Sequence, residues 1–257
     1  MIPISEPDTD AARTALRARQ GKGARYDSPA APAGPLALAR LGTAYFARRL
    51  NELTGQELDA PSLVPGWSRR HIVADIGFQA RALARLVEAA REGRPQEVLH
   101  EPEARNEDVA FGATLPDHAL RYLFHHSEVH LNVEWRDLSA EGWAASVRTL
   151  EGRPVAVAQT PGMRAAAIWL AAVDLANGGT FRDFPAELTD LLLAGAGDPP
   201  PVTLRPTDRP APVVRGGGPV VSGCAADLAR WLTGRGARRL DGAARLPDPP
   251  FWRPGRP

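Results

Sequence analysis

The chain has 257 residues, a formal net charge of +1 and a single cysteine, Cys224. A charge this close to zero gives no overall attraction to nucleic acid or anionic lipid, and a lone cysteine excludes an internal disulfide and any CxxC metal or redox motif. No stretch reaches the ~18 consecutive apolar residues of a membrane span, and the N-terminus lacks the apolar core of a signal peptide. We therefore expect a cytoplasmic protein without nucleic-acid or membrane partners.

The first third of the chain predicts a disordered extension followed by two helices. Residues 1–34 mix acidic, basic and proline-rich segments with little apolar content, which is typical of disorder. Residues 36–53 carry apolar side chains at helical spacing and predict the first helix. Ser68 is a natural N-cap and Gly93 a natural stop for a long second helix.

The middle of the chain predicts a third long helix that carries several histidines. The polar connection over residues 94–113 is long enough to hold a short ordered helix or loop in the segment PEARNEDVAFG. Thr114 and Asp117 resemble a capping box, from which the helix would run through Leu138. Its histidines are His125, His126 and His130.

A β-hairpin and an alanine-rich helix are expected next. Residues 145–150 and 154–159 alternate apolar and polar side chains, as a hairpin does. The stretch 163–185 predicts a helix buried nearly all round, ended by left-handed Gly178 and Gly179.

The helices together suggest two structural parts. With a further helix over residues 185–193, they predict an up-and-down four-helix bundle over residues 35–196. Residues 197–257 are rich in proline, glycine and valine and predict a small α/β domain that ends in a tail, LPDPPFWRPGRP. Its expected elements are strands at 202–205, 213–215 and 220–221 and an amphipathic helix at 224–233. The predicted fold class is therefore α+β.

Several segments, in order from about Leu36 to the end of the chain, carry a family resemblance. They are LARLGTAYFARRL, GWSRRHIVADI, PEARNEDVAFGATL, the MR and VDL of the alanine-rich helix, TFRDFP, VVSG and TGRG. Through them the chain resembles the mycothiol-dependent maleylpyruvate isomerases of the DinB-like bundle superfamily. The resemblance implies a DinB-like bundle that holds one divalent metal, usually zinc, beneath a small α/β domain. The resemblance also implies that the thiol mycothiol binds at the metal, that its thiolate adds to a cis double bond, and that rotation followed by elimination of the thiol gives the trans isomer.

The metal ligands that the resemblance implies are not present in this chain. The family's histidine on the second helix falls on Asp75, and its glutamate and histidine on the alanine-rich helix fall on Ala167 and Ala171. Two of the three positions have lost every donor atom, and zinc in a catalytic site needs about three protein ligands. We therefore expect no zinc and no other cofactor, while mycothiol stays open as a thiol partner.

Three residues are candidates for catalysis. Asp75 could be a buried general acid or base with a raised pKa, or it could form an ion pair with an arginine. His126 and His130 lie four apart on the third helix, and His71 and Asp75 lie four apart on the second. These residues could form a shifted metal site. The alternative is that the histidines are simply exposed side chains on their helices.

Five residues are candidates for substrate binding. Arg105 and Asn106 could bind a substrate carboxylate or form salt bridges within their own segment. The resemblance implies that Arg235 binds substrate carboxylates, and a charge at a helix C-terminus is the alternative. Arg164 lies in the family-like MR, and Trp169 is expected in the core or the pocket wall.

We consider three functions for a monomer or homodimer that takes a small-molecule substrate. The first is a metal-independent isomerase or cyclase acting on a small unsaturated or secondary-metabolite substrate. The second is a thiol-dependent isomerase or transferase with a shifted metal site. The third is a noncatalytic ligand-binding protein.

Overall fold

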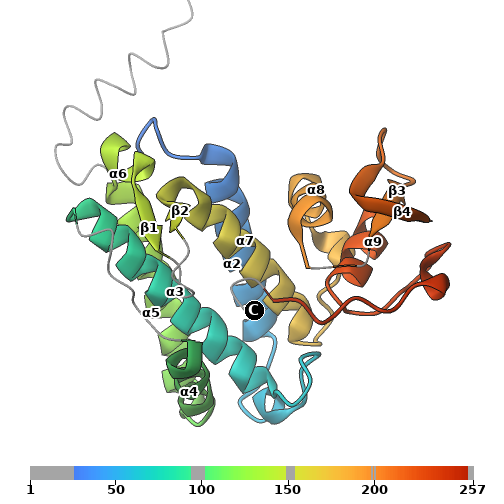
Figure 1. Cartoon of the computed structure of the whole chain (residues 1–257). Helices are drawn as coiled ribbons and strands as arrows, with labels where there is room; N and C mark the ends of the chain where they lie inside the picture. Colours follow the sequence, from blue (N-terminus) through green and yellow to red (C-terminus); the bar gives the residue numbers. More distant parts are fainter. Residues whose placement is uncertain (1–25, 94–101, 149–153, 198, 200, 254–257) are drawn as a thin grey trace, which may run out of the picture.

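The computed structural model describes residues 26–93, 102–148, 154–197, 199 and 201–253 (Figure 1). The helices of its first part are α2 (Ala33–Asn51), α3 (Arg69–Arg91), α4 (Pro102–Ala113), α5 (Asp117–Asp137), the short α6 (Ala140–Ala144) and α7 (Thr160–Asp174). Most of the expected N-terminal extension lies outside the described residues. Within it, Asp27 accepts two hydrogen bonds from Arg40 of α2, at 2.6 and 2.7 Å.

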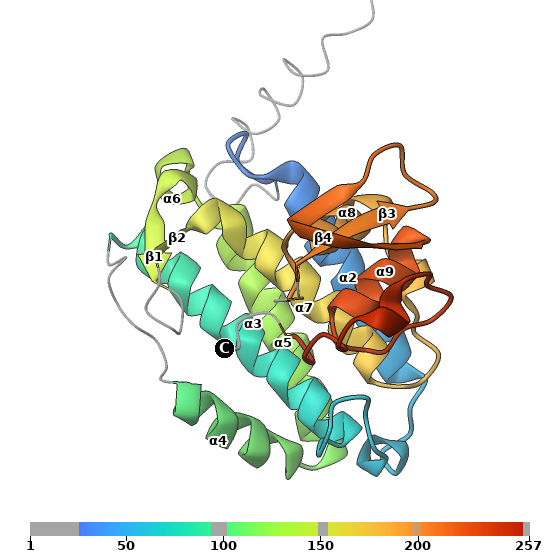
Figure 2. The ribbon, with the colours of Figure 1, turned by 45° about the vertical axis from the view of Figure 1, so that its right-hand side comes forward.

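Four long helices form the expected up-and-down bundle, and the predicted fold class is confirmed. α2 packs along α7, α3 packs along α5, and α3 also contacts α7. The PEARNEDVAFG segment is a helix, α4, which lies on the outer side of α3 (Figure 2). Gly42 permits the close approach of α2 and α7, because a Cβ atom there would lie 2.6 Å from the Trp169 side chain.

Helix α3 begins at the predicted N-cap, Ser68. The Ser68 backbone N–H donates to Nδ1 of His71 at 3.3 Å, and the Ser68 Oγ lies 2.9 Å from the same nitrogen. Burial lowers the pKa of His71, and its Nδ1 accepts the hydrogen bond from the Ser68 backbone. The capping box predicted at Thr114 is wrong. Helix α5 begins at Asp117 after Pro116, and the Thr114 hydroxyl instead donates to the Phe111 carbonyl at 2.7 Å.

Helix α7 differs from its prediction at both ends. It begins at Thr160 rather than Met163. It ends before the predicted glycines, because Ala176, with a φ of 53°, takes the first left-handed position after it. Arg69 offsets this strain by donating hydrogen bonds to the carbonyls of Leu175 and Ala176, at 2.7 and 2.9 Å.

A short hairpin and a small domain complete the fold. β1 (Ser146–Arg148) and β2 (Pro154–Ala156) pair in antiparallel fashion, so the predicted hairpin is confirmed in its described part. The later elements are α8 (Ala186–Gly195), β3 (Val202–Pro206), β4 (Val213–Gly223) and α9 (Ala225–Leu232). α8 contacts α9 and β4 as well as α7, so it lies with the small domain although it precedes the expected boundary at residue 197.

The strands predicted at 213–215 and 220–221 are the two ends of a single strand, β4. Thr203 of β3 pairs with Val214 on one side and with Val220 on the other, so β3 lies between these ends. Three glycines with positive φ, residues 216–218, reverse the chain between them.

Residues 249–253, which we name the C-terminal segment, return from the small domain to the bundle (Figure 1). The Trp252 N–H donates to the Thr233 carbonyl at 3.1 Å, which holds the segment against the end of α9. The prediction that this stretch is a tail is therefore wrong for its described residues. Among the helices that the structure describes, none combines the length and apolarity of a membrane span.

Candidate functional site

Asp75, Ala167 and Ala171 line one small cavity, so the structure brings together the three positions on which we expected the family's metal ligands to fall. The cavity measures about 10 Å³, and its other charged lining residues are Arg105, Asp174, Arg235 and Arg253. A volume of this size accommodates about one water molecule. The two alanines contribute only methyl groups to its wall.

Asp75 forms a buried ion pair with two arginines. Its side chain is 3 % exposed. Arg105 of α4 donates to Oδ1 at 2.9 Å, and Arg253 of the C-terminal segment donates to Oδ2. The Arg253 guanidinium also stacks 4.2 Å from the centre of the Trp67 ring. The structure therefore shows the ion-paired arrangement of Asp75 and not an isolated buried carboxyl group.

A second buried ion pair joins the end of α7 to the small domain. Arg235 donates to both oxygens of Asp174, at 2.8 and 2.6 Å, and both side chains are 2 % exposed. The same guanidinium donates to the carbonyls of Thr233 and Trp252 and lies 4.2 Å from the centre of the Phe251 ring. Arg235 thus pairs with a carboxylate of the bundle.

These five side chains form a charge cluster, the name we keep for Asp75, Asp174, Arg105, Arg235 and Arg253. Three guanidinium groups therefore share the buried space around two carboxylates. Guanidinium groups stay protonated even when buried.

A divalent metal does not fit this arrangement. Both oxygens of Asp75 already accept hydrogen bonds from arginines, and Ala167 and Ala171 offer no donor atoms. A cation placed here would also lie beside the guanidinium groups of Arg105, Arg235 and Arg253, which repel it. Over the part of the chain that the structure describes, no three histidine, cysteine or acidic side chains come close enough to hold a metal.

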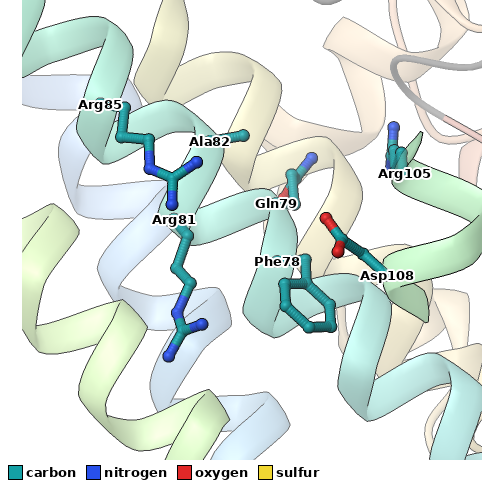
Figure 3. A pocket seen from close by; sticks show the side chains of 7 residues that line it. All are labelled: Phe78, Gln79, Arg81, Ala82, Arg85, Arg105 and Asp108. Atoms are coloured by element: carbon teal, nitrogen blue, oxygen red, sulfur yellow. The ribbon is translucent and has the colours of Figure 1, made fainter. Parts of the chain in front are cut away.

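A larger cavity of about 160 Å³ lies between α3 and α4, beside the charge cluster. Arg105 lines both cavities and therefore connects them. Figure 3 shows Asp108 of α4 pointing toward Gln79 and Phe78 of α3, with Arg81 and Arg85 further along the same helix. Basic side chains thus continue from the cluster into this cavity.

The two candidate histidines lie elsewhere. His126 is exposed on α5, and His130 is half-buried on the same helix with its Nε2 3.5 Å from Oε1 of Glu134. Neither lines the cavities beside Asp75, and His71 caps α3. The structure therefore does not bring these histidines to the charge cluster.

The other substrate-binding candidates are spread over the bundle. Asn106 is exposed on α4, next to Arg105. Trp169 is buried, stacks on Tyr45 with ring centres 4.8 Å apart, and donates to the Leu38 carbonyl at 3.0 Å. Arg164 is buried near the start of α7 and donates to the Ile76 carbonyl and to Gln79, both at 2.8 Å.

Sequence reasoning missed Arg253 as a part of the site. Arg253 lies in a proline-rich stretch without periodicity, and no local pattern indicates that it contacts α3. The only available signal was the aromatic pair Phe251 and Trp252, because large aromatic side chains in a supposed tail favour packing against a surface.

The bundle and the small α/β domain meet at a buried polar site. This arrangement defines a class of enzyme fold, and comparison with known proteins identifies the family. Residues 39–176 match the family model described as the mycothiol maleylpyruvate isomerase N-terminal domain. The chain therefore belongs to the mycothiol-dependent maleylpyruvate isomerase family, a family of enzymes, and the resemblance seen in its sequence is confirmed.

Two solved structures show the same relationship. A histidine-to-alanine mutant of the mycothiol-dependent maleylpyruvate isomerase is 35 % identical, with a TM-score of 0.78, and the match covers 85 % of this chain and 96 % of that one. The structure described as the mycothiol-dependent maleylpyruvate isomerase is 34 % identical, with a TM-score of 0.77 and the same coverage. A search of the curated proteins found no match.

Proposed function

We propose that this protein is a metal-independent isomerase that acts on a small unsaturated carboxylate. The observation that carries the proposal is the double ion pair of Asp75 with Arg105 and Arg253, beside Ala167 and Ala171. Family membership supports isomerase-type chemistry. The charge cluster supplies the positive charge that the family's metal would otherwise provide.

The chemistry requires stabilisation of a developing anion. When a nucleophile adds to a double bond conjugated with a carbonyl group, negative charge collects on the carbonyl oxygen, and fixed guanidinium groups stabilise that charge. Mycothiol, when bound, supplies the nucleophilic sulfur that the family name implies, and a positively charged site favours the thiolate form. Arg105 and Arg253 would bind and orient the substrate, and Asp75 would hold both arginines in place until the substrate arrives.

Substrate entry requires a movement of the C-terminal segment. The cavity beside Asp75 is about 10 Å³, too small for an organic acid. A substrate carboxylate can exchange with that of Asp75 for the same guanidinium groups, because the two carry the same charge and hydrogen-bonding geometry. The cavity between α3 and α4 provides space beside Arg105 for the rest of the substrate.

The test is an isomerase assay with cis-unsaturated carboxylates, maleylpyruvate among them, with and without mycothiol and with a metal chelator. Activity should survive the chelator. Arg105→Ala and Arg253→Ala should each lower kcat/KM by about 10- to 100-fold, since a hydrogen bond to a charged group contributes ~1.5–3 kcal/mol. Arg238→Ala, an exposed arginine of the same small domain, is the matched control and should leave kcat/KM unchanged.

Three results would contradict the proposal. Activity that depends on added zinc and on His126 and His130 would favour the thiol-dependent alternative with a shifted metal site. Wild-type activity in both arginine variants would show that the charge cluster is structural. Tight binding of these acids without turnover, with or without mycothiol, would favour a noncatalytic binding protein.

A further inference from the structure

A third cavity, of about 260 Å³, lies between α2, α5 and α7. Its polar lining includes Arg40, Glu128, Asn132 and Arg164, and its apolar lining includes Leu131 and Trp135. None of these residues lines the cavities beside Asp75. It is therefore a separate site from the charge cluster.

Arg164 is the unusual feature of this cavity, because its charge is buried without an ion-pair partner among the described residues. Its side chain is 1 % exposed. Nη1 donates to two neutral acceptors, the Ile76 carbonyl and Gln79 Oε1, and Nη2 has no hydrogen-bond partner in the described part of the chain. Burial lowers the pKa of Arg164 to about 10. A buried cation normally has an anion in contact with it. Among the described residues no carboxylate forms a hydrogen bond or ion pair with Arg164, and Glu128 and Asp75 act on it only through their charges.

The rest of the lining suits a ligand with one charged end. Glu128 is partly buried, and this burial raises the pKa of its carboxyl group, whereas the charges of His125 and Arg164 act to lower it. The Asn132 side-chain oxygen already accepts a hydrogen bond from Arg40 Nε at 2.8 Å. Leu131 and Trp135 add apolar side chains on the same face of α5 as Glu128 and Asn132.

We propose that this cavity binds a small carboxylic acid with an apolar body, whose carboxylate pairs with Arg164. A planar guanidinium group recognises a carboxylate through paired hydrogen bonds. The volume of about 260 Å³ is enough for a single-ring or short-chain acid.

Calorimetric titration of the full chain with benzoate tests the proposal, with neutral benzamide as the matched ligand. Benzoate should bind and benzamide should not. Arg164→Gln should weaken benzoate binding by at least about tenfold, and Glu128→Gln should strengthen it, because a residual negative charge beside the site is removed. Ala47→Phe keeps Arg164 but fills the cavity, so it should also abolish binding; this variant tests the site even if Arg164→Gln does not fold.

Arg253→Ala is the control for the charge cluster and should leave benzoate affinity unchanged. Loss of binding in Arg253→Ala would place benzoate at the charge cluster and overturn the proposal. Unchanged binding in Ala47→Phe would do the same. So would the absence of binding by both benzoate and hexanoate at millimolar concentration.

Discussion

Arg253 donates a hydrogen bond to Asp75 across 178 positions of sequence, from the C-terminal segment to the second turn of α3. Its guanidinium group thereby lies beside a carboxylate that lines the same cavity as Ala167 and Ala171. Asp75 is shared with Arg105, so the carboxylate is neutralised from two directions. Three of the predictions below depend on this pairing or on the small domain that delivers Arg253.

Asp75→Asn should destabilise the protein by ~3–5 kcal/mol, because it leaves two buried guanidinium groups without their carboxylate. Urea unfolding measures this change, and Asp248→Asn, at an exposed position, is the control. The sequence alone allowed a small cost, as for an unpaired carboxyl group. In a double-mutant cycle, Arg253→Ala should cost less in the Asp75→Asn background than in the wild type. A loss below ~1 kcal/mol, where surface substitutions usually fall, would mean that the ion pairs do not hold the segment in solution.

The purified protein should contain far less than one zinc per chain, as measured by elemental analysis. Introducing Asp75→His, Ala167→Glu and Ala171→His together places three ligands around one cavity, with an open fourth position. Arg253→Ala should be needed as well, because its guanidinium would repel the metal. We expect stoichiometric zinc in the quadruple variant and less in the triple variant. Stoichiometric zinc in the wild type would contradict this account of the site.

Stability should fall as the pH drops below about 6.5, in part because of His71. Its folded pKa lies below the unfolded value of about 6.5, so the unfolded chain takes up the proton first as the pH falls. The neutral ring therefore contributes its full stabilisation of the folded state above about pH 6.5, and this contribution decreases at lower pH. His71→Gln should reduce the slope of stability against pH below pH 7. Thermal unfolding at a series of pH values measures this slope. His118→Gln, on an exposed surface of α5, should leave the slope as it is.

Cys224 should be a slow nucleophile at neutral pH. Burial raises the pKa of its thiol, and the thiol donates a hydrogen bond to Asp227 at 3.0 Å, which raises the pKa further. Its alkylation by iodoacetamide should therefore reach half its maximal rate above the pH typical of a free cysteine. Asp227→Asn should accelerate the reaction, because it removes a negative charge and leaves Arg182 near the sulfur. Mass spectrometry follows the reaction cleanly, since the chain has one cysteine. An equal or slower rate in the variant would contradict the role of Asp227.

The long helices could be predicted because each carries an apolar face that repeats at helical spacing. Their ends were harder. Thr114 bonds back to the Phe111 carbonyl at the end of α4 and does not cap α5, and the turn at Ala176 is held by Arg69 from another helix. The convergence of Asp75, Ala167 and Ala171 followed from the sequence register. The arginine that completes the site did not, because a contact between Asp75 and Arg253 leaves no trace in local periodicity.

The placement of the arginines also determines how the molecule denatures. Asp75 and Asp174 belong to the bundle, whereas Arg235 and Arg253 come from the small domain. Pulling the two parts apart would leave Asp174 without Arg235 and Asp75 with Arg105 but without Arg253, at a surface that is buried in the native state. The bundle and the small domain should therefore melt as one cooperative unit and give a single calorimetric peak, and a bundle expressed without residues 197–257 should be short-lived.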